Sequence, residues 1–398
     1  MIISILGIAG AKFDHEKCLP KKENGKILYS KAFYNASVLN KNSNSYCNST
    51  HFLLENFDDK FVFIGTKCAI KFQKEILHKY ILDKDIIFKE VEDNSLDDIF
   101  EDVFELLENY ENIILDITHG FRHQPIMAIF ASTLSQFLNR KDLKIIFAKE
   151  EEKNKKYSYI YLDEYIEITQ LSLLLTGFIR TLNFIGVKNL TLINSQVFEN
   201  FSEALLSNDI KGVEKYYKKL DKELWRLKKR EDLKHLENLL DMIYKELSIL
   251  RNFEHFDIYL KYFILSKMTI EKNYLIVSIT YIFESLREYC SFRFENITKN
   301  IRFRNSYEKN TEVMDTVCNI KRNRKENKIQ KKFKYIYEKN RSQFKRVAKV
   351  YKEVKDIRNE LAHINRDKSF NDIKNQIKDI IVQIENLFAD KVLENIRY

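Results

Sequence analysis

The first part of the chain alternates short apolar runs with amphipathic stretches. Apolar runs of strand length cover residues 2–8, 61–65, 86–91, 112–117 and 144–148. Between these runs, apolar side chains recur at helical spacing in residues 68–80, 96–110 and 125–138. Strands that alternate with helices predict a parallel, doubly wound sheet, so the fold class expected for this part is α/β. Residues 157–162 are expected to form a short β-ribbon. Residues 27–48, which are rich in Asn, Ser and Tyr, are expected to form an inserted loop or hairpin.

From about residue 169 the pattern becomes almost entirely helical. One amphipathic face is predicted within 344–364, with apolar side chains at 347, 350, 354, 357, 361 and 364. A final helix is predicted from the apolar positions 373, 377, 380, 384 and 387. We therefore expect an α/β domain followed by all-α structure. The predicted divisions are an α/β domain over 1–165, a helical linker or dimerisation region over 166–255 and a helical domain over 256–398.

A polar loop follows one of the predicted strands. Residues 116–125 read Asp-Ile-Thr-His-Gly-Phe-Arg-His-Gln-Pro, directly after the apolar residues 113–115, and Pro125 stands where a helix is expected to begin. Ligands of open α/β sheets bind at the carboxyl ends of the strands, and a helix N-terminus there favours an anion. The candidate ligand contacts in this loop are Thr118, His119, Gly120 and Arg122.

Other positions near strand ends are weaker candidates. Asp116 is expected to brace the loop rather than touch an anion, and Arg122 could pair with an acidic neighbour instead of a phosphate. Further ligand contacts are predicted where the first and second strands end, at Gly7, Gly10, Gly65 and Thr66. Each of these also fits an ordinary strand-ending turn.

A second motif lies near the carboxyl end, where residues 358–363 read Arg-Asn-Glu-Leu-Ala-His. On a helix Asn359 and His363 share one polar face, and the long Arg358 side chain can reach it. A His can move protons near neutral pH, and an Arg can stabilise phosphoryl oxygens, so the pair suits metal-free RNA cleavage. The alternative is a solvated Arg and a His that stabilises the helix end.

Charge is concentrated just before this motif. Residues 321–346 hold twelve Lys or Arg against two Glu, a local excess of +10 within a chain of net charge +9. A concentrated basic tract predicts an anionic partner, here single-stranded RNA, because cationic grooves follow phosphate backbones. The candidate RNA contacts are Lys331, Lys332 and Lys334. The alternative is a solvated helix face.

Composition narrows the setting. The five cysteines are scattered without a CxxC pair, which predicts free thiols in a reducing compartment and no structural zinc. The amino terminus has no basic residue before its apolar stretch and predicts a strand rather than a signal peptide. The most apolar later stretch, 171–187, is interrupted by Arg180 and Asn183 and is too polar to span a bilayer. We expect a cytoplasmic protein that does not contact membranes.

The two motifs together resemble a family of CRISPR-associated proteins. The loop Asp116-Ile-Thr-His-Gly resembles the DxTHG signature of proteins with an N-terminal CARF domain, a Rossmann-like ligand sensor. The segment from Arg358 to His363 resembles the R-x4-6-H signature of HEPN ribonucleases. The resemblance implies a homodimeric, cytoplasmic endoribonuclease of type III CRISPR antiviral defence, allosterically activated by cyclic oligoadenylate. By resemblance, Arg358, Asn359 and His363 are catalytic, no cofactor is needed for catalysis, and the products carry 2′,3′-cyclic phosphates.

Two alternatives to this function stay open at the level of sequence. One is a nucleotide-sensing regulator whose HEPN-like domain binds RNA or a partner without cleaving. The other is a ring nuclease, in which the sensor also degrades its ligand, with Thr118 and His119 orienting a ribose 2′-hydroxyl. The sequence leaves open the ring size of the activator, the RNA sequence preference and any oligomer beyond a dimer.

Overall fold

The structure is a computed structural model that describes residues 1–138, 142–151, 156–186, 190–318, 329, 336–362 and 368–394. The chain divides into two compact units. The first contains Met1–Leu171 and a short stretch up to Leu192; the second contains Ser172–Gly186 and the chain from Ile193 onward. In the described part of the chain, every helix is too short or too polar to cross a membrane.

An eight-stranded sheet forms the centre of the first unit, in the order β7-β6-β12-β11-β10-β1-β8-β9. Five neighbouring strands are parallel: β11 (Leu143–Glu150), β10 (Ile113–Asp116), β1 (Ile2–Ile5), β8 (Phe61–Thr66) and β9 (Ile86–Val91). The parallel arrangement predicted from the alternating pattern is confirmed for these strands. At one edge the sheet continues through β12 (Lys156–Tyr161), antiparallel to β11, and then β6 (Ala32–Asn35) and β7 (Asn44–Tyr46).

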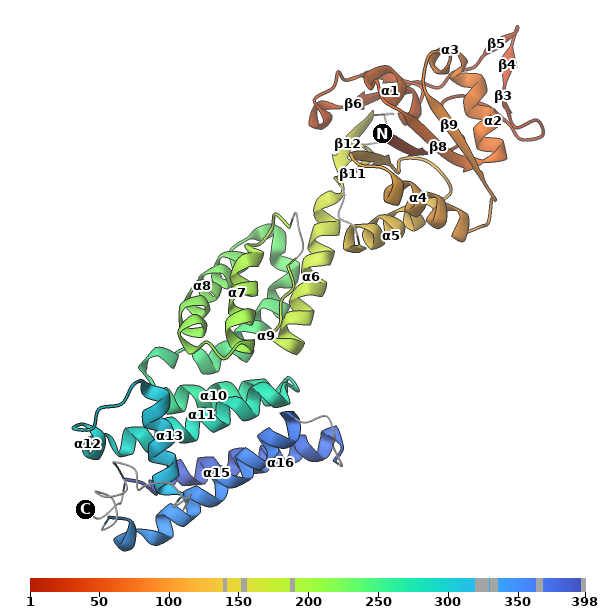
Figure 1. Cartoon of the computed structure of the whole chain (residues 1–398). Helices are drawn as coiled ribbons and strands as arrows, with labels where there is room; N and C mark the ends of the chain where they lie inside the picture. Colours follow the sequence, from red (N-terminus) through yellow and green to blue (C-terminus); the bar gives the residue numbers. More distant parts are fainter. Residues whose placement is uncertain are drawn as a thin grey trace. The chain divides into compact units, whose positions relative to one another are not determined.

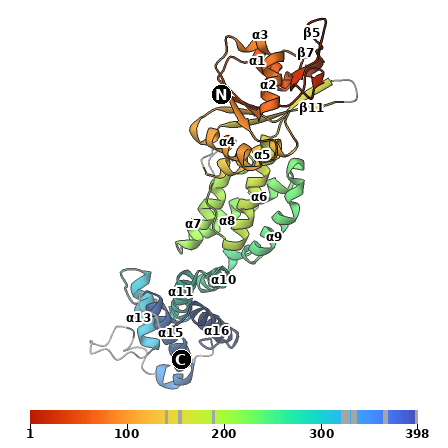
Figure 2. The same ribbon diagram turned by 90° about the vertical axis from the view of Figure 1, so that its right-hand side faces the viewer.

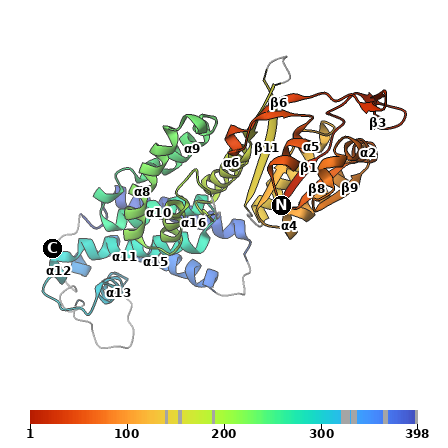
Figure 3. The same cartoon turned by 90° about the horizontal axis from the view of Figure 1, so that it is seen from above.

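Helices cover both faces of this sheet (Figures 1 and 3). One face packs under α1 (Ser49–Asn56) and α2 (Lys67–Ile76), which α3 (His78–Ile81) follows; the other packs under α4 (Asp97–Asn109) and α5 (His123–Leu138). Neighbouring β1 side chains point to opposite faces, so Ile2 and Leu6 enter one core while Ile3 and Ile5 enter the other. A strand buried on both faces reads as a nearly continuous apolar run, and in β1 only Ser4 interrupts it.

The Asn- and Ser-rich segment was predicted to be an inserted loop or hairpin, and the hairpin is confirmed: β6 and β7 pair antiparallel and join the edge of the sheet beside β12. One local expectation was wrong in detail. The helix after the polar loop begins at His123, two residues before Pro125. Pro125 therefore lies within the first turn. A backbone N–H at that position has no partner within the helix, so the missing N–H of proline costs no helical hydrogen bond.

The long helix α6 (Asp163–Thr181) leads from the first unit into the second, which is helical throughout its described residues. Its longer helices are α7 (Ser195–Leu206), α8 (Ile210–Lys228), α9 (Glu237–Leu247), α10 (Ile258–Glu271), α11 (Leu275–Arg293), α13 (Ser306–Val317), α15 (Arg341–Ala362) and α16 (Phe370–Ala389), and a single turn, α12 (Glu295–Thr298), follows α11. Figure 2 shows α10, α11, α13, α15 and α16 packed as one bundle.

The predicted apolar faces of the last two helices are confirmed for the described residues, whereas Ile364 lies outside them. In α15 the buried positions include Val347, Val350, Val354, Ile357 and Leu361, and in α16 Ile373, Ile377, Ile380, Ile384 and Leu387. They enter one core with α10, α11 and α13. The opposite, polar face of α15 is left exposed, and the second motif lies at the end of this helix.

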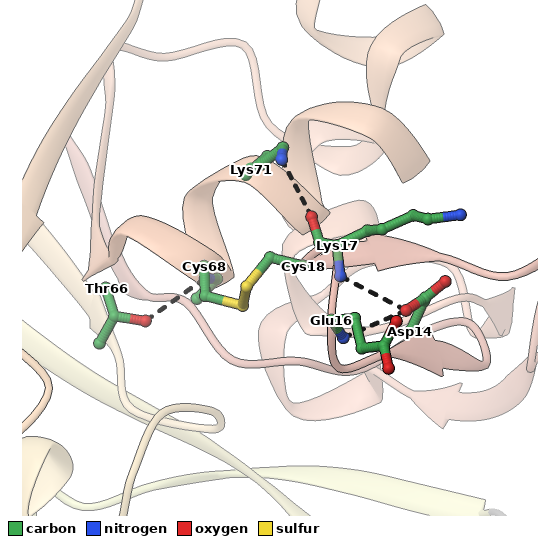
Figure 4. Close-up of a disulfide and its surroundings, with 8 residues drawn as sticks. Asp14, Glu16, Lys17, Cys18, Thr66, Cys68 and Lys71 are labelled. Atoms are coloured by element: carbon green, nitrogen blue, oxygen red, sulfur yellow. Dashed lines mark hydrogen bonds between the residues drawn. A yellow bond between two sulfur atoms is a disulfide. The ribbon is translucent and has the colours of Figure 1, made fainter.

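The expectation that all cysteines are free thiols was wrong. Cys18 and Cys68 form a disulfide with a Cα–Cα distance of 5.1 Å, whereas Cys47, Cys290 and Cys318 are free (Figure 4). Cys18 lies between two short strands, β2 (Phe13–Asp14) and β3 (Leu19–Pro20), and this excursion folds over α2, where Cys68 is the second residue. Fifty residues separate the two thiols, so no local pattern could indicate their pairing.

Candidate functional site

The polar loop lies at the switch point of the sheet. In the sheet, β1 pairs with β8 on one side and with β10 on the other. The connections therefore diverge where β1 and β10 end, which leaves a crevice at their carboxyl ends. Ser4 on β1 is in register with Asp116 on β10, so the loop from 117 to 122 begins beside the end of β1.

Asp116 anchors the loop through a buried set of hydrogen bonds. Its Oδ2 accepts from the hydroxyls of Ser4 (2.8 Å) and Ser49 (2.9 Å). Its Oδ1 accepts from the backbone N–H (3.1 Å) and the hydroxyl of Thr118. The Asp116 side chain is completely buried, so these four donors replace the water that a carboxylate needs. The expected bracing role of Asp116 agrees with these contacts.

Tyr159 on β12 and Thr118 extend this network. The Tyr159 hydroxyl lies 2.7 Å from that of Ser49, and burial together with Asp116 raises the pKa of Tyr159 well above its ordinary value. The Thr118 hydroxyl donates to Asp116 and accepts from the Ala148 N–H at 2.9 Å. The hydroxyl hydrogen of Thr118 is thus used inside the protein.

His119 is joined to the start of α1. The backbone N–H of Ser49 donates to Nε2 of His119 at 3.2 Å. Burial lowers the pKa of His119, although nearby Asp116 acts in the opposite direction. The ring is therefore neutral at physiological pH, and because Nε2 accepts, the hydrogen stands on Nδ1. His119 can offer one N–H donor at Nδ1.

A cavity of about 90 Å³ opens between the ends of β1 and β8 and the start of α5. It is lined by Leu6, Gly7, Ile8, Thr66, Ala69, Gly120, Phe121 and Gln124. Three predicted ligand contacts, Gly7, Thr66 and Gly120, are thus brought together. Gln124 was missed by the sequence reasoning, although its position in the first turn of a helix after a strand-end loop could have drawn attention to it.

The glycines of the crevice are required by close packing. A Cβ on Gly7 would lie 2.8 Å from the backbone nitrogen of Gly120. Gly120 has φ of +103°, and a Cβ there would lie 2.6 Å from Ile5. The two strand-end loops can approach each other only because both positions are glycine. Gly10 packs instead against Asn48, Ile76 and Cys47, and Gly65 against Leu6, and neither lines the cavity.

The remaining predicted residues of the loop lie outside this cavity. Thr118 and His119 are half-buried beside it, and Arg122 is exposed just before α5. Their role in ligand binding stays a prediction.

The second motif is only partly within the described residues. Arg358 and Asn359 are exposed near the end of α15, and Glu360 forms an ion pair with Lys368 at 2.9 Å. His363 lies outside the described residues, as do Lys331, Lys332 and Lys334 of the basic tract.

An aromatic side chain lies under the Arg358 guanidinium. The guanidinium carbon of Arg358 is 4.7 Å from the ring centre of Phe283 on α11. The guanidinium of the buried Arg287 lies 5.3 Å from the same ring, and Tyr351 of α15 stacks on it at 5.2 Å. Phe283 is nearly buried, so the ring that contacts Arg358 is itself held by the helical core.

Metal ligands do not gather in the described part of the chain: no group of three or more His, Cys, Asp or Glu there could hold an ion.

Comparison with known proteins assigns the first unit. Residues 32–152 match the CARF domain of the CRISPR system endoribonuclease Csx1. This stretch includes β8, β10 and the loop from Asp116 to Arg122. The chain therefore carries a CARF domain, and this part of the expected resemblance is confirmed, whereas the HEPN part stays a prediction.

Two other comparisons add little to this assignment. No curated protein sequence matches the chain. Among solved structures, Enterococcus italicus Csm6 bound to cyclic hexa-2′-fluoro-hexa-dAMP aligns with 100% of this chain and 94% of its own, at 12% identity and a TM-score of 0.40. The CARF assignment rests on the family match and not on this likeness.

Proposed function

We propose that this protein is an endoribonuclease of type III CRISPR defence that cleaves single-stranded RNA without a metal and is activated by cyclic oligoadenylate. The observation that carries the proposal is the match of residues 32–152 to the CARF domain of Csx1, a stretch that contains Thr66 and the loop from Asp116 to Arg122. In the same chain, α15 presents Arg358 and Asn359 on an exposed polar face, as an RNA-cleaving motif requires.

The crevice suits an anionic nucleotide. Helices α2 and α5 both begin at the cavity, and their N-terminal N–H groups carry partial positive charge. None of the residues that line the cavity is acidic. The neutral His119 of the same loop carries one further N–H donor. Donors without opposing carboxylates favour phosphate oxygens.

The proposed reaction needs one base, one acid and one fixed positive charge. The RNA 2′-oxygen attacks phosphorus while its proton leaves, and the bond from phosphorus to the 5′-oxygen breaks. The products are a 2′,3′-cyclic phosphate and a 5′-hydroxyl. His363 would transfer the proton, Arg358 would stabilise the charged phosphorane, and Asn359 would orient the phosphate.

Dimer formation is supported by an apolar stripe on α5. Ile126, Phe130, Leu134 and Leu138 recur every four residues and are 51%, 58%, 40% and 62% exposed. A helix face of this kind is expected to bury itself against a second copy, and the same face on both copies gives two-fold symmetry. A two-fold dimer would offer a matching pair of crevices to a cyclic ligand.

The test is RNA cleavage with and without cyclic tri-, tetra- and hexa-adenylate. We expect one ring to accelerate cleavage, in the presence of EDTA, and His363→Ala and Arg358→Ala each to lower the rate by about 100-fold or more. If wild type binds a ring but never cleaves RNA, the protein is a regulator instead. If it shortens the ring itself, it is a ring nuclease. Activity that needs added magnesium contradicts the metal-free reaction.

The dimer has its own test. Phe130→Glu places a charge in the middle of the apolar stripe and should lower the measured mass to that of a monomer and abolish activation. Leu82→Glu is the matched control, because Leu82 is 66% exposed but lies after α3, away from the stripe. The measurement is sedimentation-velocity ultracentrifugation. A Phe130→Glu variant that stays dimeric places the interface elsewhere.

A further inference from the structure

The side-chain amide of Gln124, in the first turn of α5, has a hydrogen-bond partner at its oxygen and none at its nitrogen. The backbone N–H of Phe121 donates to its Oε1 at 3.0 Å. Its Nε2 has no hydrogen-bond partner, and the residue is 0% exposed. Because an N–H can only face the oxygen of the amide, the contact with Phe121 fixes which end is which. The amino group is therefore the end that lacks a partner.

A second glutamine beside the crevice has partners at both ends of its side-chain amide. Gln73 on α2 is equally buried, yet its Nε2 donates to the carbonyls of Gly7 and Ala9, and its Oε1 accepts from Asn48. Buried donors are almost always paired in folded proteins, and an unpaired one needs an explanation, of which a bound ligand is one. Gln124 carries such a donor and is one of the residues that line the cavity.

The cavity favours one kind of partner for this donor. Two helices of ten and sixteen residues, α2 and α5, begin at it, and Thr66 caps the first by accepting from the Ala69 N–H. Both helix N-termini attract negative charge. Leu6, Ile8 and Ala69 make much of the wall apolar, and a hydrogen bond formed against such a wall is strengthened. At about 90 Å³ the space corresponds to roughly three water volumes, enough for a phosphate group.

We propose that Gln124 is a ligand-binding residue whose side-chain amino group donates to a phosphodiester oxygen of the cyclic ligand. This inference rests on the proposed function and adds to it a specific contact. Without ligand, the amino group of Gln124 is unpaired. When the ligand binds, a phosphodiester oxygen becomes its acceptor. Gln124 then links the ligand directly to the first turn of α5, the helix that carries the apolar stripe.

Gln124→Glu is the sharpest substitution. It keeps an oxygen for the Phe121 N–H and replaces the amino group with an anionic oxygen. We expect it to weaken binding of the cyclic oligoadenylate preferred by wild type by about 10- to 100-fold, since a charge-assisted bond becomes a repulsion. Gln124→Met, which removes the donor without adding charge, should weaken binding by about tenfold.

Gln170→Met is the matched control. Gln170 on α6 also has a buried Nε2 without a partner, but it does not line the cavity. Its substitution should leave the dissociation constant unchanged. Thermal unfolding of each variant, followed by circular dichroism, tests whether the fold is kept.

A modified ligand tests the atom that is contacted. Calorimetry would compare the ring with its phosphorothioate analogue, in which sulfur, a poor acceptor, replaces one oxygen of each phosphate. The sulfur should weaken binding to wild type and to Gln170→Met, but weaken it much less in Gln124→Met, where the donor is already gone.

Two results would overturn the assignment. In one, Gln124→Glu and Gln124→Met bind the ring as wild type does. In the other, sulfur weakens binding equally in wild type and Gln124→Met, which would place the donor against a base or a ribose. If wild type binds none of the three rings, the proposed ligand is wrong and the assignment of Gln124 is lost with it, an outcome separate from the first two.

Discussion

The loop after β10 and the end of α15 carry the two motifs, and they are held in opposite ways. The loop is fixed by a buried carboxylate, Asp116, that accepts four hydrogen bonds from three residues. The end of α15 is held by apolar contacts on one face, while Arg358 and Asn359 remain exposed on the other. The loop of the crevice is therefore fixed by contacts within one chain.

The two regions therefore lack different things. A crevice preorganised by buried polar groups requires only its ligand, because the reorganisation was completed during folding. An exposed Arg on a helix end lies over an aromatic ring but has water on its other side. In our proposal, the partner copy supplies the missing surroundings, and the ligand controls how the two copies meet.

The largest effect that separates the two regions should come from substituting one charged residue in each. Asp116→Asn replaces one carboxylate oxygen with an amino group. Depending on which oxygen is replaced, the amino group faces either the hydroxyls of Ser4 and Ser49 or the two donors of Thr118. We expect it to lower the free energy of unfolding of the first unit by about 2 kcal/mol, because buried donors lose their acceptor. Hydrogen exchange of the β1 and β10 amides measures this quantity locally.

Two controls accompany this substitution. Asp83→Asn changes an exposed carboxylate of the same unit and should leave exchange unchanged. Arg358→Ala should change the stability of the second unit by less than about 1 kcal/mol while it removes RNA cleavage. Comparable losses of stability in Asp116→Asn and Arg358→Ala would contradict the contrast drawn between the two regions.

A smaller effect is expected at Phe283. Phe283→Leu removes the ring face under Arg358 and leaves an apolar side chain in the core, so the guanidinium loses its orientation. We expect cleavage to slow by about two- to fivefold, the worth of an exposed cation–π contact, and Phe283→Tyr to keep the wild-type rate.

Phe388→Leu is the packing control for Phe283. Phe388 belongs to the same core but contacts Tyr259, Phe263 and Tyr289 rather than Arg358. If the two leucine variants lose equal activity and equal stability, Phe283 acts only through packing. Single-turnover kinetics, with a saturating excess of protein over RNA, separates the rate of cleavage from RNA binding.

The smallest effect concerns pH. Because the pKa of His119 is lower in the folded protein than its ordinary value of about 6.5, the unfolded chain binds its proton more readily. The contribution of His119 is thus fully present above about pH 6.5 and is lost as the pH falls towards the lowered pKa. Chemical denaturation between pH 7.5 and 5 should show this loss, and His119→Gln should reduce it. An identical pH dependence in His119→Gln would mean that other groups govern it.

Sequence periodicity predicted much of this structure because periodicity reports local burial. Strand β9 lies where the apolar run 86–91 placed it, and the buried stripes of α15 and α16 fall on the predicted positions. The crevice was also predictable, since a polar loop after a buried strand reaches the carboxyl end of the sheet. The order of residues along one element was enough for each of these.

Other features depended on contacts between residues far apart in the chain. Ser4 and Asp116 are 112 positions apart, Cys18 and Cys68 are 50 apart, and β6 joins the sheet beside β12. No local pattern encodes such pairings, because they depend on where separate elements meet.

Local sequence patterns predicted the parallel strands, the helices that follow them and the positions of the two motifs. The fold alone brings Ser4 and Ser49 to Asp116, brings Gly7 to Gly120, and leaves the amino group of the cavity-lining Gln124 unpaired. The physical reason is that periodicity records how much of a side chain is buried, whereas hydrogen bonding depends on which distant groups are brought within 3 Å or so of it.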